Sequence, residues 1–176
     1  IVFLTFTFKL RMNLVIDIGN TQVKAAVFEL DTIREQIIFD EIIFLEEIQN
    51  IVKKHKISHC ILSSVKETKQ EYIELLQKIP FFIELSPITK VPFKNLYSTP
   101  NTLGIDRIAL VVAAVSQFPK NNTLIIDAGT CITYDFVNSN DEYLGGAISP
   151  GIHIRYKSLH NFTSKLPELS KTEDYF

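Results

Sequence analysis

The sequence is poor in the residues that mark fibrous, disordered or disulfide-stabilised chains. It has 6 glycines and 7 prolines among 176 residues, with 46% hydrophobic and 22% charged residues. These proportions exclude a collagen-like, low-complexity or disordered chain. Its two cysteines, Cys60 and Cys131, cannot build a disulfide framework and lack the C-x-x-C spacing of a metal knuckle or redox pair. A reducing, cytoplasmic setting fits this cysteine usage best.

An excess of positive charge is also missing. Eighteen Lys and Arg residues stand against twenty Asp and Glu residues, which gives a net charge of −2. This balance leaves no basic surplus for neutralising a phosphate backbone, so we expect no nucleic acid partner.

The sequence also lacks a long hydrophobic run. The apolar residues 1–10 are followed by no small-residue cleavage site, and ten residues are too short to span a bilayer, so we expect no membrane partner. Met12 is the only methionine and stands just before the first well-patterned strand. We therefore predict that residues 1–11 are an N-terminal extension outside the fold. The alternation of apolar residues within this stretch leaves an extra edge strand as the alternative.

Periods of two and of 3.6 residues predict a mixed α/β chain. The first part is predicted to contain strands at 13–18, 22–30, 33–39, 60–65 and 81–85, and helices at 46–56 and 66–78. The proline-bearing segment 86–101 is predicted to be irregular, and a strongly apolar helix should follow from about 103 to 118. The remainder is predicted to contain strands at 123–128, 131–137 and 143–148, then a helix near 151–160.

The chain contains an internal repeat. Residues 123–130, TLIIDAGT, repeat the pattern of residues 13–21, NLVIDIGNT: an apolar strand, Asp-x-Gly, then Thr and another strand. The repeat predicts two similar domains, at 12–118 and 119–176, that face a shared cleft. Because the second copy is much shorter than the first, we expect the second domain to be incomplete.

The turn that begins at Asp17 is a candidate phosphate-binding site. Gly19 would let the backbone approach a ligand, while successive N–H groups and the Thr21 hydroxyl could hold phosphate oxygens. Asp17, at the strand end, could hold Mg²⁺ directly or through water. A plain hairpin turn would explain one copy. The second copy favours phosphate binding, because an ordinary turn has no reason to repeat its flanking Asp and Thr.

Two further motifs leave alternatives open. Asp106 and Arg107 form a charged pair at the beginning of an apolar helix. The helix dipole stabilises an aspartate there, which supplies a simple capping role. The carboxylate could equally accept a proton from a substrate hydroxyl while the arginine binds an anionic group in bidentate fashion. The glycines of Tyr143–Gly151 could serve close backbone approach to a ligand or a simple strand-to-helix turn.

Four motifs in this order resemble those of the type III pantothenate kinases, members of the acetate and sugar kinase and actin-like ATPase superfamily. The resemblance runs from Met12 to about Phe176 and implies an α/β, actin-like ATPase fold with two RNase H-like domains, the second truncated. The four motifs are Asp17-Ile18-Gly19-Asn20-Thr21, the run from Tyr97 and Pro100 to Leu103-Gly104-Ile105-Asp106-Arg107, Asp127-Ala128-Gly129-Thr130, and Gly145-Gly146-x-Ile148-x-Pro150-Gly151.

The resemblance implies a kinase that uses ATP and Mg²⁺ to phosphorylate pantothenate to 4'-phosphopantothenate, the first step of coenzyme A biosynthesis. The residues that would line ATP are Asp17, Ile18, Gly19, Asn20, Thr21, Gln22, Val23, Lys24 and Thr130. Those that would hold pantothenate are Tyr97, Gly104, Ile105, Asp106 and Arg107. Asp106 would be the catalytic base for the primary hydroxyl. Asp127 would coordinate a monovalent cation, K⁺ or NH₄⁺.

Members of that family work as homodimers in which a threonine from the neighbouring subunit completes the pantothenate site. That threonine lies in a motif after Lys165-Leu166-Pro167, and Thr172 lacks the glycine-bearing context expected of it. We therefore expect a homodimer if the full-length chain is present. The alternatives are a non-catalytic family relative, such as an accessory factor of transcription, or an inactive fragment. Another kinase of the superfamily is disfavoured by the run from Tyr97 to Arg107.

Overall fold

The computed structural model describes residues 12–169, so the predicted N-terminal extension and its alternative as an edge strand lie outside the described residues. The chain forms two compact units. Of the described residues, the first unit holds 12–89 together with Gly104–Asp106, and the second holds Lys90–Leu103 and 107–169. This division differs from the predicted domain boundary after residue 118, because most of the apolar helix groups with the second unit.

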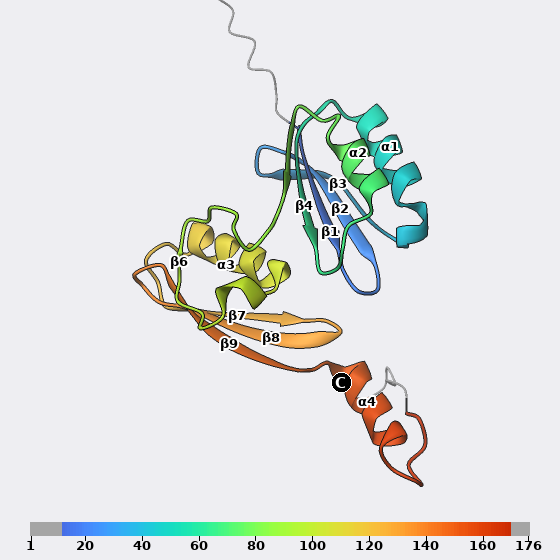
Figure 1. Ribbon diagram of the computed structural model, residues 1–176, viewed down its shortest axis with the longest axis vertical. Helices are drawn as coiled ribbons and strands as arrows, with labels where there is room; N and C mark the ends of the chain where they lie inside the picture. The colour runs from blue at the N-terminus through green and yellow to red at the C-terminus, as the bar shows by residue number, and fades with distance from the viewer. Residues whose placement is uncertain (1–11, 170–176) are drawn as a thin grey trace, which may run out of the picture. The chain divides into compact units, whose positions relative to one another are not determined.

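The first unit is built on a five-stranded sheet (Figure 1). Its strands are β1 (Met12–Ile18), β2 (Val23–Glu29), β3 (Thr32–Phe39), β4 (Ile57–Ser64) and β5 (Phe81–Glu84). Their order across the sheet is β3-β2-β1-β4-β5. The β1–β2 and β2–β3 pairs are antiparallel, whereas β4 runs parallel to both β1 and β5. The predicted hairpin and the strands around it are therefore present.

Two helices cover one face of this sheet (Figure 1). A short 3₁₀ turn at Glu41–Ile43 leads into α1 (Phe44–Lys54), and α2 (Gln70–Leu76) follows β4. Helix α2 is shorter than the predicted helix at 66–78. Ser64 is one reason, because its hydroxyl donates a hydrogen bond to the carbonyl of Lys66 at 2.8 Å and holds the chain in a turn there.

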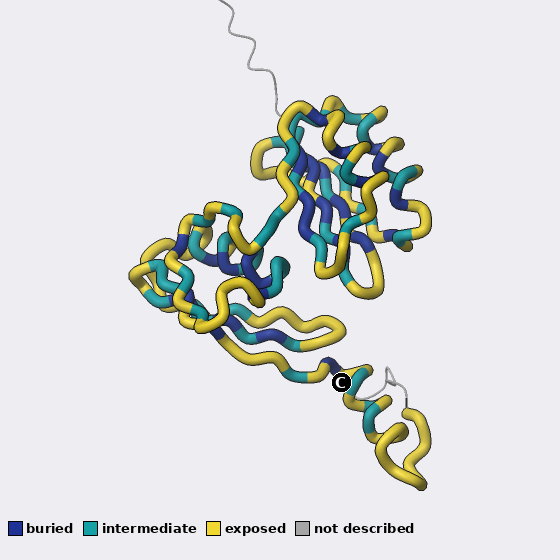
Figure 2. The backbone as a smooth tube through the Cα atoms, viewed as in Figure 1, coloured by how far each residue is buried: buried dark blue, intermediate teal, exposed yellow. Residues whose placement is uncertain are grey.

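The core of the first unit lies between these helices and the sheet (Figure 2). The alternate residues of β1 that face the helices are fully buried, as the period of two requires of a strand covered on one face. The other side of this core is the apolar stripe of α1, at the helical spacing i, i+4, i+7. The buried residues of these two elements are Leu14, Ile16, Ile18, Phe44, Ile48 and Ile51.

The second unit is built on a four-stranded sheet of order β6-β9-β8-β7. Its strands are β6 (Lys94–Asn95), β7 (Thr123–Ala128), β8 (Cys131–Val137) and β9 (Glu142–Pro150). The β7–β8 and β8–β9 pairs are antiparallel, so this unit also contains the predicted second hairpin. The segment predicted to be irregular contains β6, which pairs with β9. A strand of two residues is too short to show a periodic pattern in the sequence.

Helix α3 (Ile105–Gln117) lies over one face of the second sheet and buries Arg107, Ile108, Val111 and Ala114. A 3₁₀ turn at Pro100–Thr102 precedes it. The opposite face of the sheet presents large apolar side chains to solvent, among them Leu124 and Ile126. Helix α4 (Ile152–Asn161) follows β9 and buries none of its residues.

The predicted mixed α/β class with two β-sheets is confirmed. No helix within residues 12–169 is long and apolar enough to cross a membrane.

Candidate functional site

The first repeated hairpin presents an exposed tip at the end of β1. The backbone N–H of Gly19 donates to the carbonyl of Gln22 at 3.1 Å and closes the turn. A β-carbon on Gly19 would approach that carbonyl oxygen to 3.2 Å, so a side chain would crowd the turn. Asn20 and Thr21 are exposed at the tip. The tip therefore offers backbone N–H groups and a hydroxyl to solvent, as a phosphate cradle requires.

Two of the residues predicted to line ATP point into the core instead. Ile18 is 1% exposed and Val23 is 0% exposed. Their side chains belong to the apolar cluster of the first unit. Only their backbones are therefore available to a ligand. The sequence motif does not distinguish residues that contribute a side chain from residues that contribute only their backbone.

Asp17 has polar residues opposite it on both neighbouring strands. It pairs with Lys24 on β2 and with Ser63 on β4. The Ser63 hydroxyl is buried and has no hydrogen-bond partner among the described residues. A carboxylate and a hydroxyl at the carboxyl ends of two parallel strands are oxygen donors of the kind that Mg²⁺ accepts, together with water and phosphate oxygens. The residues present therefore fit a Mg²⁺ ion at Asp17.

The second repeated hairpin is closed by a similar backbone hydrogen bond, over a turn that is one residue shorter. The N–H of Gly129 donates to the carbonyl of Cys131 at 2.8 Å. Asp127 and Thr130 are exposed. Within residues 12–169 no three His, Cys, Asp or Glu side chains gather as a metal-binding group. A cation at Asp127 would therefore need hydroxyl, carbonyl or water oxygens as its other ligands.

The glycines within β9 and directly after it serve close packing within the second unit. Gly145 has a φ of +105°, and a β-carbon there would lie 3.1 Å from the ring of Tyr97. A β-carbon on Gly151 would lie 2.3 Å from the carbonyl oxygen of Gly129. The N–H of Gly151 also donates to the carbonyl of Thr130 at 3.0 Å. The structure therefore joins three of the four motifs, through contacts that leave no space for side chains at these glycines.

Arg107 is fixed by a buried network that the sequence analysis missed. Its Nε lies 2.9 Å from one carboxylate oxygen of Asp135 on β8, and an Nη donates to the same oxygen at 2.6 Å. The same Nη donates to the hydroxyl of Tyr143 on β9 at 2.9 Å, and that hydroxyl donates to Asp135 at 2.6 Å. Asp135 and Tyr143 are 0% exposed and Arg107 is 5% exposed. The bidentate fork predicted for a substrate anion is thus made with Asp135.

A signal for this network was present in the sequence. Asp135 stands at an inward position of an alternating strand, two residues from Thr133 and from Val137. A carboxylate among buried strand positions requires a cationic partner, and Arg107 is the charged residue of an otherwise apolar helix face. The two observations match only when α3 is placed on β8, which local patterns do not specify.

Burial and charge shift the pKa values of this network. Burial raises the pKa of the Tyr143 hydroxyl, and its hydrogen bond to Asp135 raises it further. Burial alone would lower the pKa of Arg107, but the hydrogen bond and the charge of Asp135 outweigh it, so that the pKa is raised. The tyrosine therefore stays neutral and the arginine stays charged. The Arg107 guanidinium also lies over the ring of Tyr97, 5.6 Å from its centroid, a cation–π contact.

Asp106 stands in the first turn of α3 and is half-buried, as are Gly104 and Ile105 just before it. Its neighbour Arg107 is the first buried residue of the helix, so the two charged residues lie in different environments. The arginine is held in the second unit's interior, while the aspartate remains partly accessible to a substrate.

Comparison with known proteins identifies the family of the chain. Residues 13–175 match the family model for type III pantothenate kinase. The chain belongs to the type III pantothenate kinase family. It is 50% identical over 163 residues to the type III pantothenate kinase of Flavobacterium psychrophilum, a match that covers 92% of this chain and 68% of that one. The enzyme of the same name from Christiangramia forsetii is 51% identical over 157 residues, covering 89% and 65% respectively.

The predicted family is thereby confirmed. This member of the type III pantothenate kinase family spans about two thirds of the length of the curated relatives it matches. It also resembles a crystal structure of a conserved Baf family transcriptional activator from Campylobacter jejuni. That structure has a TM-score of 0.54 at 28% identity, and the match covers 93% of this chain and 67% of the other.

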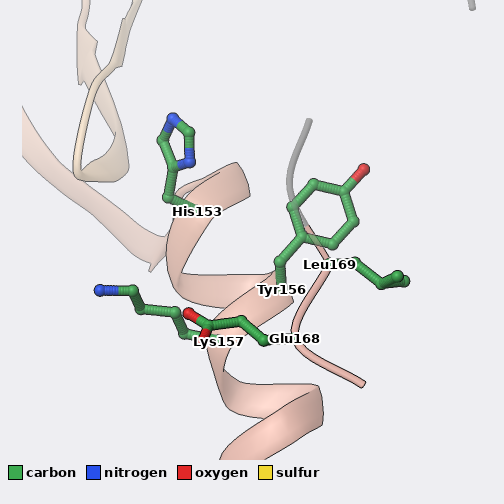
Figure 3. A pocket seen from close by; sticks show the side chains of 5 residues that line it. All are labelled: His153, Tyr156, Lys157, Glu168 and Leu169. Carbon is green, nitrogen blue, oxygen red and sulfur yellow. The ribbon is translucent and has the colours of Figure 1, made fainter. Parts of the chain in front are cut away.

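A hollow elsewhere in this family member contains none of the predicted site residues (Figure 3). It measures about 320 Å³ and lies between α4 and the segment that follows it. Its walls are formed by His153, Tyr156, Lys157, Glu168 and Leu169. Of its charged residues, Lys157 lies on α4 and Glu168 lies in the segment that follows the helix. None of its residues belongs to the four motifs or to the repeat. The candidate functional residues are therefore those of the first hairpin in the first unit, and those of the second hairpin and the beginning of α3.

Proposed function

We propose that the protein transfers the γ-phosphoryl group of ATP to the primary hydroxyl of pantothenate, which gives 4'-phosphopantothenate and ADP as the first step of coenzyme A biosynthesis. The observation that carries this proposal is the ordered set of motifs within one family match that covers residues 13–175. Because the chain spans about two thirds of its relatives' length, the activity of these 176 residues is the point to test.

The two hairpins supply the nucleotide contacts in this proposal. The turn Asp17–Thr21, with Gln22, would hold phosphate oxygens through backbone N–H groups and the Thr21 hydroxyl. Ile18 and Val23 would contribute their backbones alone, since their side chains are buried. Lys24, which is exposed, would add a positive charge. Thr130 in the second hairpin would be a further ATP contact. Such contacts position the phosphates and neutralise their charge, which is most of what phosphoryl transfer needs.

Cations would complete the charge balance. A bound Mg²⁺ at Asp17 would neutralise phosphate oxygens as negative charge shifts toward the leaving group. A monovalent cation, K⁺ or NH₄⁺, at Asp127 would compensate the charge of that carboxylate beside the nucleotide. The support for both is the oxygen-donor character of the residues present, with a hydroxyl opposite each aspartate on a neighbouring strand.

Asp106 would be the catalytic base. As the pantothenate oxygen attacks the γ-phosphorus, the hydroxyl proton passes to the Asp106 carboxylate and the bond to the ADP oxygen breaks. Arg107 would face the substrate's anionic group, with Tyr97, Gly104 and Ile105 forming the rest of the pantothenate contacts. The buried fork to Asp135 supports this role, because it holds the guanidinium in one orientation before substrate arrives.

Mass-spectrometric detection of phosphopantothenate, after incubation with ATP, Mg²⁺ and pantothenate, tests the activity. The Asp106→Asn variant is expected to lose about 10²- to 10⁴-fold in kcat while it still binds ATP. Asp31→Asn, in an exposed turn of the first unit, is the matched control and should keep full turnover. Retained turnover in Asp106→Asn would remove its assignment as base. Absence of product from the unchanged chain would overturn the activity for these 176 residues.

A second candidate function is a non-catalytic accessory role in transcription. The observation that favours it is the resemblance to a structure described as a transcriptional activator. The two candidates separate by one experiment: pantothenate binding measured by calorimetry without any phosphate transfer would favour the accessory role. Turnover would reject it.

We further propose that the full-length protein acts as a cytoplasmic homodimer. The support is the resemblance to a family whose members share a pantothenate site across subunits. Sedimentation equilibrium of the full-length protein tests the dimer, and a monomer at enzymatically active concentrations would reject it.

A further inference from the structure

The two repeated hairpins differ at the position opposite their aspartates. In the first hairpin Asp17 on β1 pairs with Lys24 on β2. In the second hairpin Asp127 on β7 pairs with Thr133 on β8. Directly opposed residues of an antiparallel pair lie on the same face of the sheet, with their β-carbons about 4.5 to 5.5 Å apart. Thr133 is therefore the second unit's counterpart of Lys24.

This exchange removes a positive charge from the second hairpin. Lys24 is a positively charged residue at the register position opposite Asp17. Asp127 has a neutral hydroxyl at the same place. Within residues 12–169, no side chain makes a hydrogen bond or an ion pair with the Asp127 carboxylate. The charge of Asp127 is thus not compensated by a side chain of the described residues.

The Thr133 hydroxyl also lacks a partner. Thr133 is 8% exposed, and its Oγ1 makes no hydrogen bond among the described residues. A buried hydroxyl without a partner is unfavourable, because it has given up its hydrogen bonds to water. The hydroxyl shares a sheet face with the Asp127 carboxylate. One bound cation would satisfy both groups, since a carboxylate and a hydroxyl are the hard oxygen ligands that such ions take.

We propose that Thr133 is a ligand of the monovalent cation at Asp127. The proposal rests on the proposed function for the presence of a cation at Asp127.

Cation binding without nucleotide or pantothenate tests the proposal separately from kinase activity. Titration calorimetry with KCl and the thermal midpoint in KCl against choline chloride, at equal ionic strength, are the two readouts. We expect Thr133→Val, which keeps the shape and burial but removes the hydroxyl, to weaken K⁺ binding about tenfold or more. Thr133→Ser, which restores a hydroxyl, should recover most of the binding.

A third variant places a lysine opposite Asp127, as Lys24 stands opposite Asp17 in the register of the first hairpin. In Thr133→Lys the introduced ammonium should replace the cation, so that the thermal midpoint becomes the same in KCl and choline chloride. Because position 133 is buried, this variant could fail to fold, and the Val and Ser pair then decides alone.

Three results would overturn the proposal. They are no K⁺ binding by the unchanged chain, equal K⁺ affinity in Thr133→Val and the unchanged chain, and no recovery in Thr133→Ser. A chain that binds K⁺ through Thr133 but forms no phosphopantothenate would instead overturn the proposed activity and leave the cation site standing.

Discussion

The first unit packs its hairpin against α1 and α2 with apolar side chains, whereas the second unit fixes its hairpin to α3 with a buried ion pair. The first core is one cluster of mainly aliphatic and aromatic residues from four strands and two helices. The second places Arg107 and Asp135 among a smaller set of apolar residues. Two copies of one sequence pattern are therefore supported by different physical interactions.

The two kinds of core differ in how well they tolerate substitutions and in whether they orient a charged side chain. An apolar core accepts changes of shape as long as volume and burial are kept. A buried ion pair accepts no loss of one partner, because the remaining charge is left without solvent or counter-charge. In return it orients a guanidinium, which apolar packing alone does not do. The unit that we propose to hold the substrate's anionic group is the one with the oriented charge.

The largest expected effect comes from breaking the ion pair. Asp135→Ala leaves Arg107 buried without its partner and should lower the free energy of unfolding by about 3 to 5 kcal/mol. Denaturant unfolding measures this loss. The double variant Arg107→Met/Asp135→Leu is the control: it removes both charges and should regain most of the stability, although pantothenate binding is lost. A loss below about 1 kcal/mol in Asp135→Ala would show that the pair does not hold the second unit together.

The next largest effect is expected in the chemical reactivity of the two cysteines, one in each unit. Cys60 on β4 is 3% exposed, and burial raises the pKa of its thiol from 9.0 to about 12. Cys131, at the start of β8, is exposed. We expect N-ethylmaleimide to modify Cys131 at least about a hundredfold faster than Cys60 at neutral pH, because Cys60 reacts only after local opening. Mass spectrometry with Cys131→Ser as control measures both rates. Equal rates would mean that the first core opens as readily as a surface strand.

The raised pKa of Cys60 also gives a pH dependence with a definite sign. Above pH 9 the unfolded chain loses the thiol proton while the folded chain keeps it until about pH 12. The unfolded state then binds fewer protons, so the contribution of this group to stability is complete below pH 9 and is lost as the pH rises toward 12. Cys60→Ala should remove that part of the alkaline dependence.

The smallest effect on stability is expected at the uncovered face of the second sheet. Leu124 is 59% exposed and Ile126 is 57% exposed on β7. Changing both to Thr should alter the free energy of unfolding by no more than about 0.5 kcal/mol per site, since little burial is lost. It should reduce self-association, because contiguous apolar surface drives aggregation. Ile42→Thr, exposed in the 3₁₀ turn before α1, is the control for a separate apolar residue. Unchanged light scattering would show that this face does not drive association.

Much of the fold could be predicted because it depends on neighbours in the chain. The hairpin at Gly19, the helical stripe of α1 and the repeated strand at 123–128 are local patterns, and the structure contains all three. The two-residue strand β6 was missed because it has no period of its own and exists by pairing with β9. Helix α2 was predicted too long because hydrogen bonding by Ser64 competes with helix formation.

The candidate site shows the same limit. The motifs include Asp106 and Arg107. The carboxylate that binds the arginine belongs to Asp135, which lies 28 residues after Arg107 in the chain. Nothing in the helix itself specifies that partner. Likewise the motif predicted that Ile18, Val23 and Thr21 all line ATP. The pleat of the sheet turns the side chains of Ile18 and Val23 into the core.

The sequence by itself determined the order of strands and helices, the repeated Asp-x-Gly hairpin and the family, because periodicity, turn chemistry and motif order are local. Only the tertiary structure decided that Asp135 and Tyr143 hold Arg107, and that Thr133 stands opposite Asp127 where Lys24 stands opposite Asp17. Those facts depend on the register of paired strands and on the placement of a helix over a sheet. Both are set by burial and charge compensation among residues far apart in the chain.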